Sequence, residues 1–284
     1  MLAVDVTPVV GSTFTDEDVG KLEIAFLREE QADCPVTHHF GPGVYIREVI
    51  MPTGAYVIGR QHTAPHFNVM IEGHLTLINP DGTHTELVAP KTFTAPSGRK
   101  IAYIHETVRW QNVYATEETD VDTLETQLFD DNIALLEARQ TNALLLSYDH
   151  NAEHEDFNTA VEEFGFAPDI VTAISEYEGD LIPLPHGSYK MQIASSRIHG
   201  KGVFATGDIE SQELIAPVRI NGKRTPAGRF ANHSRRPNAI LFKAETGDIY
   251  MFSTQVISGC KGGMVGDEIT IDYKHALPLL MGDK

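Results

Sequence analysis

We read the fold of this chain outward from residues 228–238, which run Gly228-Arg229-Phe230-Ala231-Asn232-His233-Ser234-Arg235-Arg236-Pro237-Asn238. Asn and Ser side chains favour local hydrogen bonds and turns, and Pro237 has no backbone N–H to donate. A strand-like apolar segment, residues 239–242, follows immediately. Because the backbone groups of an irregular segment inside a folded domain still need partners, such a segment usually lines a site. We therefore expect a binding or active site at residues 228–238.

Two further motifs flank this segment in the chain. Upstream is Ser196-Arg197-Ile198-His199-Gly200-Lys201-Gly202-Val203-Phe204-Ala205, and downstream is Gly266-Asp267-Glu268-Ile269-Thr270-Ile271-Asp272-Tyr273. With residues 228–238 between them, these motifs resemble in their order the signature of SET-domain protein methyltransferases. The resemblance implies a C-terminal SET-like β-fold over residues 183–284, in which residues 228–238 pass under another loop as a pseudoknot.

The same resemblance implies a function, the transfer of a methyl group from S-adenosylmethionine to a lysine amine of a protein with a basic segment. It implies that Tyr273 is the catalytic residue and lies beside the transferred methyl group. A free lysine has a pKa near 10.4, so the site has to stabilise the neutral amine, at a cost of about 4–5 kcal/mol at pH 7. The cofactor-binding residues that the resemblance implies are Lys201, Gly202, Phe204, Arg229, Asn232 and His233.

Two features of the C-terminal motifs depart from the SET pattern. Only residues 216–227 precede Gly228, where the family has an insert that shapes the substrate groove, and no tyrosine occurs between Phe204 and Asn238. Gln212 also replaces a glycine of the pattern. The second interpretation is therefore a catalytically degenerate binding or assembly module, associated with a virion or interacting with a host. The layout, including residues 222–229, resembles SET-domain proteins encoded by bacteriophages.

Residues 35–118 differ from the C-terminal part, because short alternating segments are separated there by turn signals. Residues 79–82, Asn-Pro-Asp-Gly, are such a signal, since Gly82 can supply the positive φ of a hairpin turn. This spacing predicts a small all-β barrel or sandwich. Several short motifs resemble a cupin, more loosely than the C-terminal part resembles SET, and imply a cupin-like β-barrel over residues 1–118. They are Pro52-Thr53-Gly54, His62 with His66, Glu72-Gly73, and Pro96-Ser97-Gly98 ahead of His105.

The cupin resemblance also implies a metal site inside this β-barrel. The usual set of three histidines and a glutamate is incomplete, and His62, His66 and His105 remain as a three-histidine set. Three neutral imidazoles and a water suit Zn or Fe. The alternative is that these are hydrogen-bonded core histidines, in a barrel kept for packing or homo-oligomerisation. The other histidines that we considered are predicted to be surface loop residues: His38, His39 and His84.

Residues 119–182 form a separate segment that is rich in Asp and Glu, with Arg139 as its single base. Apolar residues at helical spacing follow candidate N-terminal caps near residues 131, 158 and 168. We therefore predict an acidic α-helical linker, which ends at Pro183 and Pro185. Another helix is predicted after Thr15, where acidic residues fill the first turn. The expected fold class is mainly β with a helical connector.

The composition resembles that of an ordinary globular protein, with 42% hydrophobic residues, 22% charged residues and a net charge of -18. This charge argues against nucleic-acid binding and favours a basic protein partner. No apolar run approaches the roughly 18 residues that span a bilayer, and the N-terminal residues lack a basic start, so we expect no membrane partner. Cys34 and Cys260 are too few for a disulfide framework. We predict a cytoplasmic protein, in the host cytoplasm or a virion if it is viral.

Overall fold

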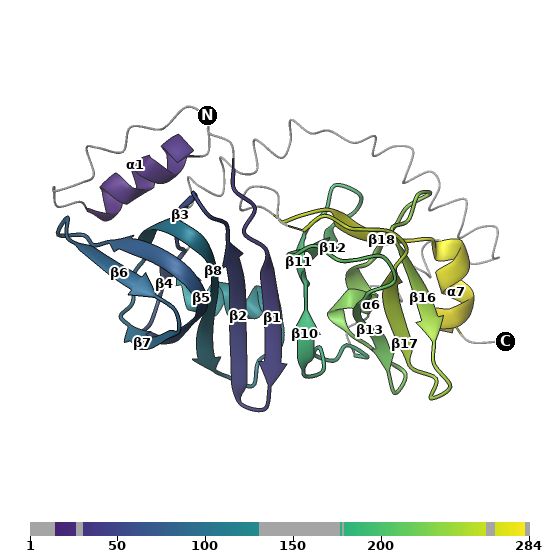
Figure 1. Ribbon diagram of the computed structural model, residues 1–284. Coiled ribbons are helices and arrows are strands. Elements are labelled where there is room, and N and C mark those ends of the chain that lie inside the picture. Colours follow the sequence, from purple (N-terminus) through teal and green to yellow (C-terminus); the bar gives the residue numbers. More distant parts are fainter. Residues whose placement is uncertain (1–14, 27–30, 131–176, 178, 260–264, 282–284) are drawn as a thin grey trace.

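The computed structural model describes residues 15–26, 31–130, 177, 179–259 and 265–281, and within these ranges the chain is mainly β. The strands form two lobes that lie side by side, the first from the N-terminal residues and the second from the C-terminal residues (Figure 1). The predicted mainly β fold class is therefore confirmed. The three helices predicted from residues 131, 158 and 168 onward lie outside the described residues.

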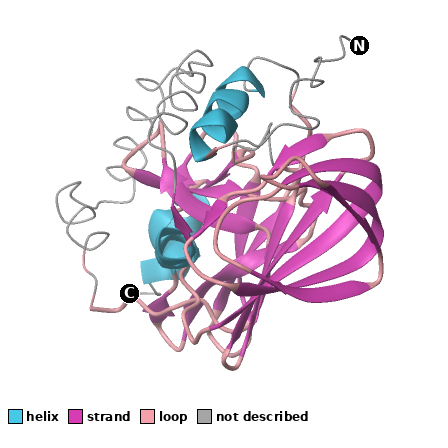
Figure 2. Cartoon of the chain, turned by 90° about the vertical axis from the view of Figure 1, so that its left-hand side faces the viewer, coloured by secondary structure: helices cyan, strands magenta, loops and turns pink. Residues whose placement is uncertain are grey.

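The N-terminal lobe is built on one eight-stranded antiparallel sheet. Its strands run in the order β10-β1-β2-β8-β5-β6, with β3 beside β8 and β7 beside β5. Figure 2 shows the strands of this sheet bending round in a curved fan. Within the described residues the sheet keeps two free ends, β10 and β6, so the predicted closed barrel is corrected to an open, curved sheet. The strands are β1 (Val36–Gly41), β2 (Val44–Met51), β3 (Tyr56–Ile58), β5 (His66–Ile78), β6 (His84–Val88), β7 (Lys91–Ala95), β8 (Ile101–Ala115) and β10 (Gly187–Tyr189).

Local sequence signals account for several of these elements. Helix α1 (Asp16–Phe26) begins after Thr15, whose hydroxyl accepts the N–H of Asp18 at 3.3 Å, while the Asp18 carboxylate accepts the N–H of Thr15 at 2.8 Å. This reciprocal pair caps the helix as predicted. Gly82 has a φ of 77° and lies in the turn between β5 and β6, so the predicted hairpin is also confirmed.

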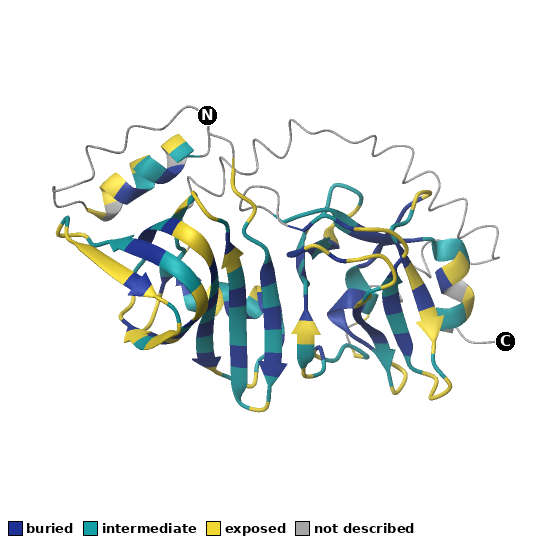
Figure 3. Cartoon of the chain, in the orientation of Figure 1, coloured by how far each residue is buried: buried dark blue, intermediate teal, exposed yellow. Residues whose placement is uncertain are grey.

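The inner face of the curved sheet carries a core of apolar side chains around Met70, Leu75 and Trp110. Buried and less buried residues alternate along β1 and along residues 108–115 of β8 (Figure 3), as the period of two in a strand requires. The Trp110 indole donates to the Asn68 side-chain oxygen at 3.0 Å, and the Asn112 amide donates to the same oxygen at 2.7 Å. This buried polar group therefore fixes β5 against β8.

A bulge in the pairing of β5 with β8 depends on Gly73, which has a φ of 97°. A Cβ atom at this position would overlap the carbonyl oxygen of Thr107. We expect the Gly73→Ala variant to lose about 2–3 kcal/mol of unfolding free energy, because both the positive φ and the close approach of β8 disfavour a side chain. Urea denaturation measures this loss. Gly54→Ala is the control, since its Cβ would meet nothing within 4 Å, although its φ is also positive. Equal losses in both variants would contradict the role of the close approach.

A two-stranded sheet and a short helix close one side of the N-terminal lobe. Strand β4 (Gln61–His62) pairs with β9 (Phe129–Asp130), and helix α2 (Val121–Leu128) leads into β9. The Asp120 carboxylate caps α2 by accepting the N–H of Thr123 at 3.0 Å. The first residues of the predicted linker therefore pack as part of the folded lobe.

The C-terminal lobe contains two four-stranded sheets. One has the order β11-β12-β18-β15 and the other the order β14-β13-β17-β16. All strand pairs in these sheets are antiparallel except β15 with β18, which is parallel. The elements are β11 (Met191–Ser195), β12 (Lys201–Ala205), β13 (Leu214–Ile220), β14 (Lys223–Arg224), α6 (Pro226–Phe230), β15 (Asn232–His233), β16 (Ala239–Lys243), β17 (Ile249–Ser253), β18 (Glu268–Ile271) and α7 (Tyr273–Met281).

A second hydrophobic cluster spans both lobes. Phe40 and Tyr45 of the first lobe, Leu124 of α2, and Met191 and Val203 of the second lobe belong to the same buried cluster. The two lobes also exchange backbone: β10 lies beyond the predicted domain limit at residue 183, yet it pairs with β1 of the first lobe. Packing and strand pairing therefore join the two predicted domains into one structural unit.

Candidate functional site

The segment that we expected to form a site lies beside the C-terminal motif. Strand β15 runs parallel to β18, with Asn232 opposite Thr270 and His233 opposite Ile271. The Asn238 amide donates to the backbone carbonyl of Glu268, and its oxygen accepts the N–H of Thr270, both at 2.8 Å. Two segments about thirty residues apart in sequence are thus held together by backbone pairing and by one asparagine side chain.

The Asn232 side chain connects all three sequence motifs. Its amide nitrogen lies 2.7 Å from a Glu268 carboxylate oxygen, 3.0 Å from the Ser196 hydroxyl and 3.1 Å from the Lys201 carbonyl oxygen. The Ser196 hydroxyl in turn donates to Glu268 at 2.8 Å. Since an amide nitrogen carries two hydrogens, these acceptors compete for its donors and fix the side chain firmly. Asn232 is 8% exposed, so this junction is buried.

Tyr273 begins α7 and lies against His233. The backbone N–H of Tyr273 donates to His233 Nδ1 at 3.1 Å, and the two ring centroids are 5.3 Å apart. Because Nδ1 accepts this bond, Nε2 carries the proton of the neutral ring. The Tyr273 hydroxyl donates to the Ala231 carbonyl oxygen at 2.9 Å. Burial raises the pKa of Tyr273 to about 12, so the phenol stays neutral near pH 7.

The remaining predicted cofactor residues surround this junction. The Lys201 ammonium forms an ion pair with Asp122 of α2 at 2.9 Å, and it lies 5.9 Å from the centre of the Phe230 ring. The Arg229 guanidinium lies 5.1 Å from the same ring centre. A Cβ at Gly202 would overlap the Glu268 carboxylate, so this glycine leaves room for the Glu268 side chain. Phe204 is half-buried on β12, opposite Glu268.

The three histidines predicted as metal ligands do not converge. His62 and His66 stack with their ring centres 3.7 Å apart, and His62 Nδ1 lies 3.0 Å from the Tyr114 hydroxyl. Burial lowers the pKa of His62 to about 2 and also lowers that of His66. His105 instead joins His74 and Glu86, the sole group of three metal-ligand side chains found within the described ranges. The predicted ligand set His62, His66 and His105 is therefore corrected, because His105 lies in a different cluster.

The prediction for His38 was also wrong. It lies on β1 rather than in a surface loop, with 1% of its surface exposed and Nδ1 2.7 Å from the Tyr45 hydroxyl. Burial lowers the pKa of His38 to about 3, with Arg47 as the next cause. Adjacent histidines in a strand face opposite sides, so the pair at 38 and 39 carried the signal that one of them would be buried.

A cavity of about 300 Å³ opens under α1 in the N-terminal lobe. Val49, Leu75 and Trp110 contribute its apolar wall, and His62 borders it. Its charged lining residues include Arg60, which pairs with Glu125, and Lys100, whose pKa is lowered by burial alone. Such a cavity is suited to a small ligand with an apolar body. The sequence pattern did not reveal it, because its walls come from strands distant in the chain.

No protein-family model matches this chain. No curated protein matches it either. Among solved structures, it is similar to an RmlC-like cupin family protein from Methanocaldococcus jannaschii, with 16% identity, a TM-score of 0.25, and coverage of 31% of this chain and 86% of that one. A cupin domain from Bordetella pertussis gives 19% identity, a TM-score of 0.26, and coverage of 31% and 98%. Values this low assign neither a family nor an activity. None of the helices in the described ranges has the length and apolar character needed to cross a membrane.

Proposed function

We propose that this chain is an S-adenosylmethionine-dependent protein-lysine N-methyltransferase of the SET type. The observation that carries the proposal is the parallel pairing of β15 with β18, because it places His233 against Tyr273. Three motifs that are separate in the sequence meet at one buried junction through Asn232. A methyltransferase of this type needs the Tyr273 phenol close to the segment proposed to bind the cofactor, which contains Asn232 and His233.

The charges around the junction fit the proposed cofactor. Arg229 and Lys201 place two cations near the Phe230 ring; since Lys201 is paired with Asp122, Arg229 is the cation that suits a carboxylate group. The Glu268 carboxylate lies beside Asn232 and Ser196, where it suits an amino or sulfonium group. When bound, S-adenosylmethionine supplies an electrophilic methyl group. Arg229, Lys201, Asn232 and His233 are the residues that we propose to hold it.

The chain's own groups would prepare the amine for attack. Tyr273 is neutral, so its hydroxyl can donate to Ala231 while its lone pairs accept a hydrogen bond from an incoming amine. The His233 contact with the Tyr273 backbone fixes the start of α7 and therefore the direction of the phenol. A buried position lowers the pKa of a lysine amine, which reduces the cost of deprotonation. The net charge of -18 favours a basic substrate segment.

A second candidate is a binding or assembly module without catalysis. It is favoured by the fact that Asn232 and the Tyr273 hydroxyl direct their donors to the chain's own acceptors. A metal-dependent cupin activity in the first lobe, a bacteriophage origin, a host-cytoplasmic or virion location and oligomerisation through the first lobe stay predictions.

Titration of the full chain with S-adenosylmethionine, followed by calorimetry, separates the two candidates. We expect one molecule to bind with a Kd below about 100 µM, and we expect Arg229→Met to weaken binding about tenfold, since it removes a cation proposed to pair with the carboxylate. Arg236→Met is the matched control, because Arg236 is exposed in the same segment. An absence of binding at millimolar concentration would eliminate the methyltransferase and leave the module.

A further inference from the structure

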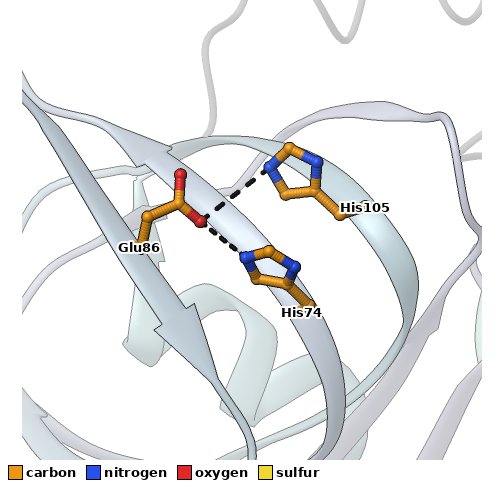
Figure 4. A group of neighbouring side chains, drawn as sticks. All are labelled: His74, Glu86 and His105. Atoms are coloured by element: carbon orange, nitrogen blue, oxygen red, sulfur yellow. Dashed lines mark hydrogen bonds and ion pairs between the residues drawn. The ribbon is translucent and has the colours of Figure 1, made fainter.

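Three side chains of the N-terminal lobe converge on its outer surface, away from both the cavity and the C-terminal junction. Figure 4 shows the rings of His74 and His105 turned toward the carboxylate of Glu86. His74 Nε2 lies 2.6 Å from Glu86 Oε2, and His105 Nε2 lies 4.0 Å from the same oxygen. The two imidazole rings are stacked with their centres 4.4 Å apart. One ligand atom from each residue falls within 4.8 Å of the others.

The sheet topology explains this convergence. His105, His74 and Glu86 come from β8, β5 and β6, which are adjacent in the sheet. Leu75 and Leu77 line the cavity, so His74 and Thr76, which alternate with them, face the opposite side. Thr76 pairs directly with Glu86. The bulge at Gly73 shifts the register of β5 against β8 immediately before His74, and bulges commonly redirect side chains toward a site.

We propose that His74, Glu86 and His105 bind a divalent transition-metal ion, for which Zn²⁺ is the probe. Two imidazole nitrogens and one carboxylate oxygen form a ligand set that Zn²⁺ and Fe²⁺ use in open sites. Ligands at about 2.0–2.2 Å from such an ion lie roughly 3.3–3.5 Å from one another. The distances of 2.6 Å and 4.0 Å lie on either side of this value, so Glu86 is already close to the separation that an ion requires from each histidine.

Thr76 supports the carboxylate of this cluster. Its hydroxyl donates to Glu86 Oε1 at 2.6 Å, which leaves Glu86 Oε2 to face His74. Hydrogen bonds from Thr76 and then from His74 lower the pKa of Glu86, so the carboxylate is charged at neutral pH. A hydrogen-bonded residue behind a metal ligand orients that ligand and increases metal affinity.

The hydrogen bonds also show how ion binding is linked to protons. Thr76 donates its single hydroxyl hydrogen to Glu86, so it accepts from His105 Nε2, which lies 2.6 Å away. His74 Nε2 likewise donates to the Glu86 carboxylate. In the metal-free protein both Nε2 atoms therefore carry hydrogens. An ion at Nε2 therefore requires each neutral ring to carry its hydrogen on Nδ1 instead.

The side chains of His74, Glu86 and His105 are 32%, 59% and 36% exposed. Three protein ligands in such an exposed position leave coordination sites for water or for a small anionic ligand. The site is separate from the stacked pair His62 and His66, which is buried and turned toward Tyr114 and Phe129. The two locations can therefore be distinguished by substitution.

Calorimetric titration of the metal-free full chain with Zn²⁺ at pH 7.5 tests the proposal. We expect one ion to bind with a Kd of about 1 µM or tighter, and we expect His74→Ala and Glu86→Gln each to weaken binding at least tenfold. Thr76→Val should weaken binding by a smaller factor, because it removes only the support of the carboxylate. His84→Ala is the matched control, since His84 is exposed on the same strand as Glu86, and it should bind as the wild type does.

Melting temperatures of the metal-free variants show whether each one is folded, and Co²⁺ absorption in the visible range gives a second measure of bound metal. Wild-type protein that takes up less than one equivalent of Zn²⁺ would overturn the proposal. Unchanged affinity in a folded Glu86→Gln variant would also overturn it. Loss of the ion in His66→Ala, with normal affinity in His74→Ala, would place the metal at the buried histidine pair instead.

Discussion

Tyr273→Phe is expected to reduce the rate of lysine methylation by about 10²–10³-fold while it changes the affinity for S-adenosylmethionine less than threefold. The variant removes a single oxygen, whose hydrogen bond to Ala231 fixes the phenol at the end of β15. Without it, the amine loses a hydrogen-bond acceptor at the point of attack, and loss of orientation raises the barrier of an in-line displacement. Unfolding free energy should fall by only about 1 kcal/mol, as for one buried hydrogen bond.

The measurement is mass spectrometry of bacterial lysate proteins after incubation with isotope-labelled cofactor and either wild-type or variant protein. Tyr250→Phe is the control, because Tyr250 is a partly exposed tyrosine of the same lobe, on β17. Labelled lysines that appear with wild type and Tyr250→Phe, and disappear with Tyr273→Phe, support the proposed chemistry. Equal labelling in all three samples would exclude Tyr273 as the catalytic residue.

The free energy of unfolding is expected to fall by about 4 kcal/mol when the pH is lowered from about 7 to about 5. Burial lowers the pKa of His38 to about 3 and of His62 to about 2, whereas both titrate near 6.5 in an unfolded chain. At any pH between the folded-state pKa and the unfolded-state pKa of each histidine, the unfolded state binds more protons than the folded state. The contribution of these two neutral histidines to the unfolding free energy is therefore complete above about pH 6.5. It falls as the pH is lowered, by about 2 kcal/mol for each histidine at pH 5.

Burial keeps these two imidazoles neutral in the folded state, and neighbouring charges add to its effect. Arg47 and Arg60 disfavour protonation of both rings, and Lys100 adds to the effect on His62. Urea denaturation at the two pH values measures the loss of stability. His38→Gln removes one titrating group, so its loss should be about 2 kcal/mol smaller, and the exposed His84→Gln control should lose as much as the wild type. A wild type whose stability differs by less than about 1 kcal/mol between the two pH values would contradict the prediction.

Local elements of this fold could be predicted because their causes lie within a few residues. The Thr15 cap, the hairpin at Gly82 and the short alternating strands all depend on neighbours in the chain. The outer strand at the β1 side of the large sheet could not be predicted in this way. It depends on β10, which pairs with β1 across about 150 residues, and no local pattern specifies that pairing.

The same distinction between local and long-range causes applies to the candidate sites. The motif residues Asn232, His233 and Tyr273 were recognisable in sequence; the structure places His233 against Tyr273 and joins Asn232 to Ser196 and Glu268. The role of Asn238 as a clamp on β18 was not apparent, since it depends on a parallel strand pair. The cluster of His74, Glu86 and His105 was missed because the partners of His105 are set by strand order and by the bulge at Gly73. Histidine spacing alone therefore did not reveal that His105 lies beside His74 and Glu86.

The position of β10 bears on how this protein can be dissected. Residues 187–189 lie in the part of the chain that we predicted as the second domain. As β10 they nevertheless form the outer strand of the first lobe's sheet, where they pair with His38 to Phe40 of β1. A fragment that ended at residue 183 would present β1 as a bare edge, ready to recruit strands from other molecules. A fragment that started there would leave Tyr189 and Met191 without Phe40 and Tyr45 as neighbours. We therefore expect either half, expressed by itself, to aggregate more readily than the whole chain.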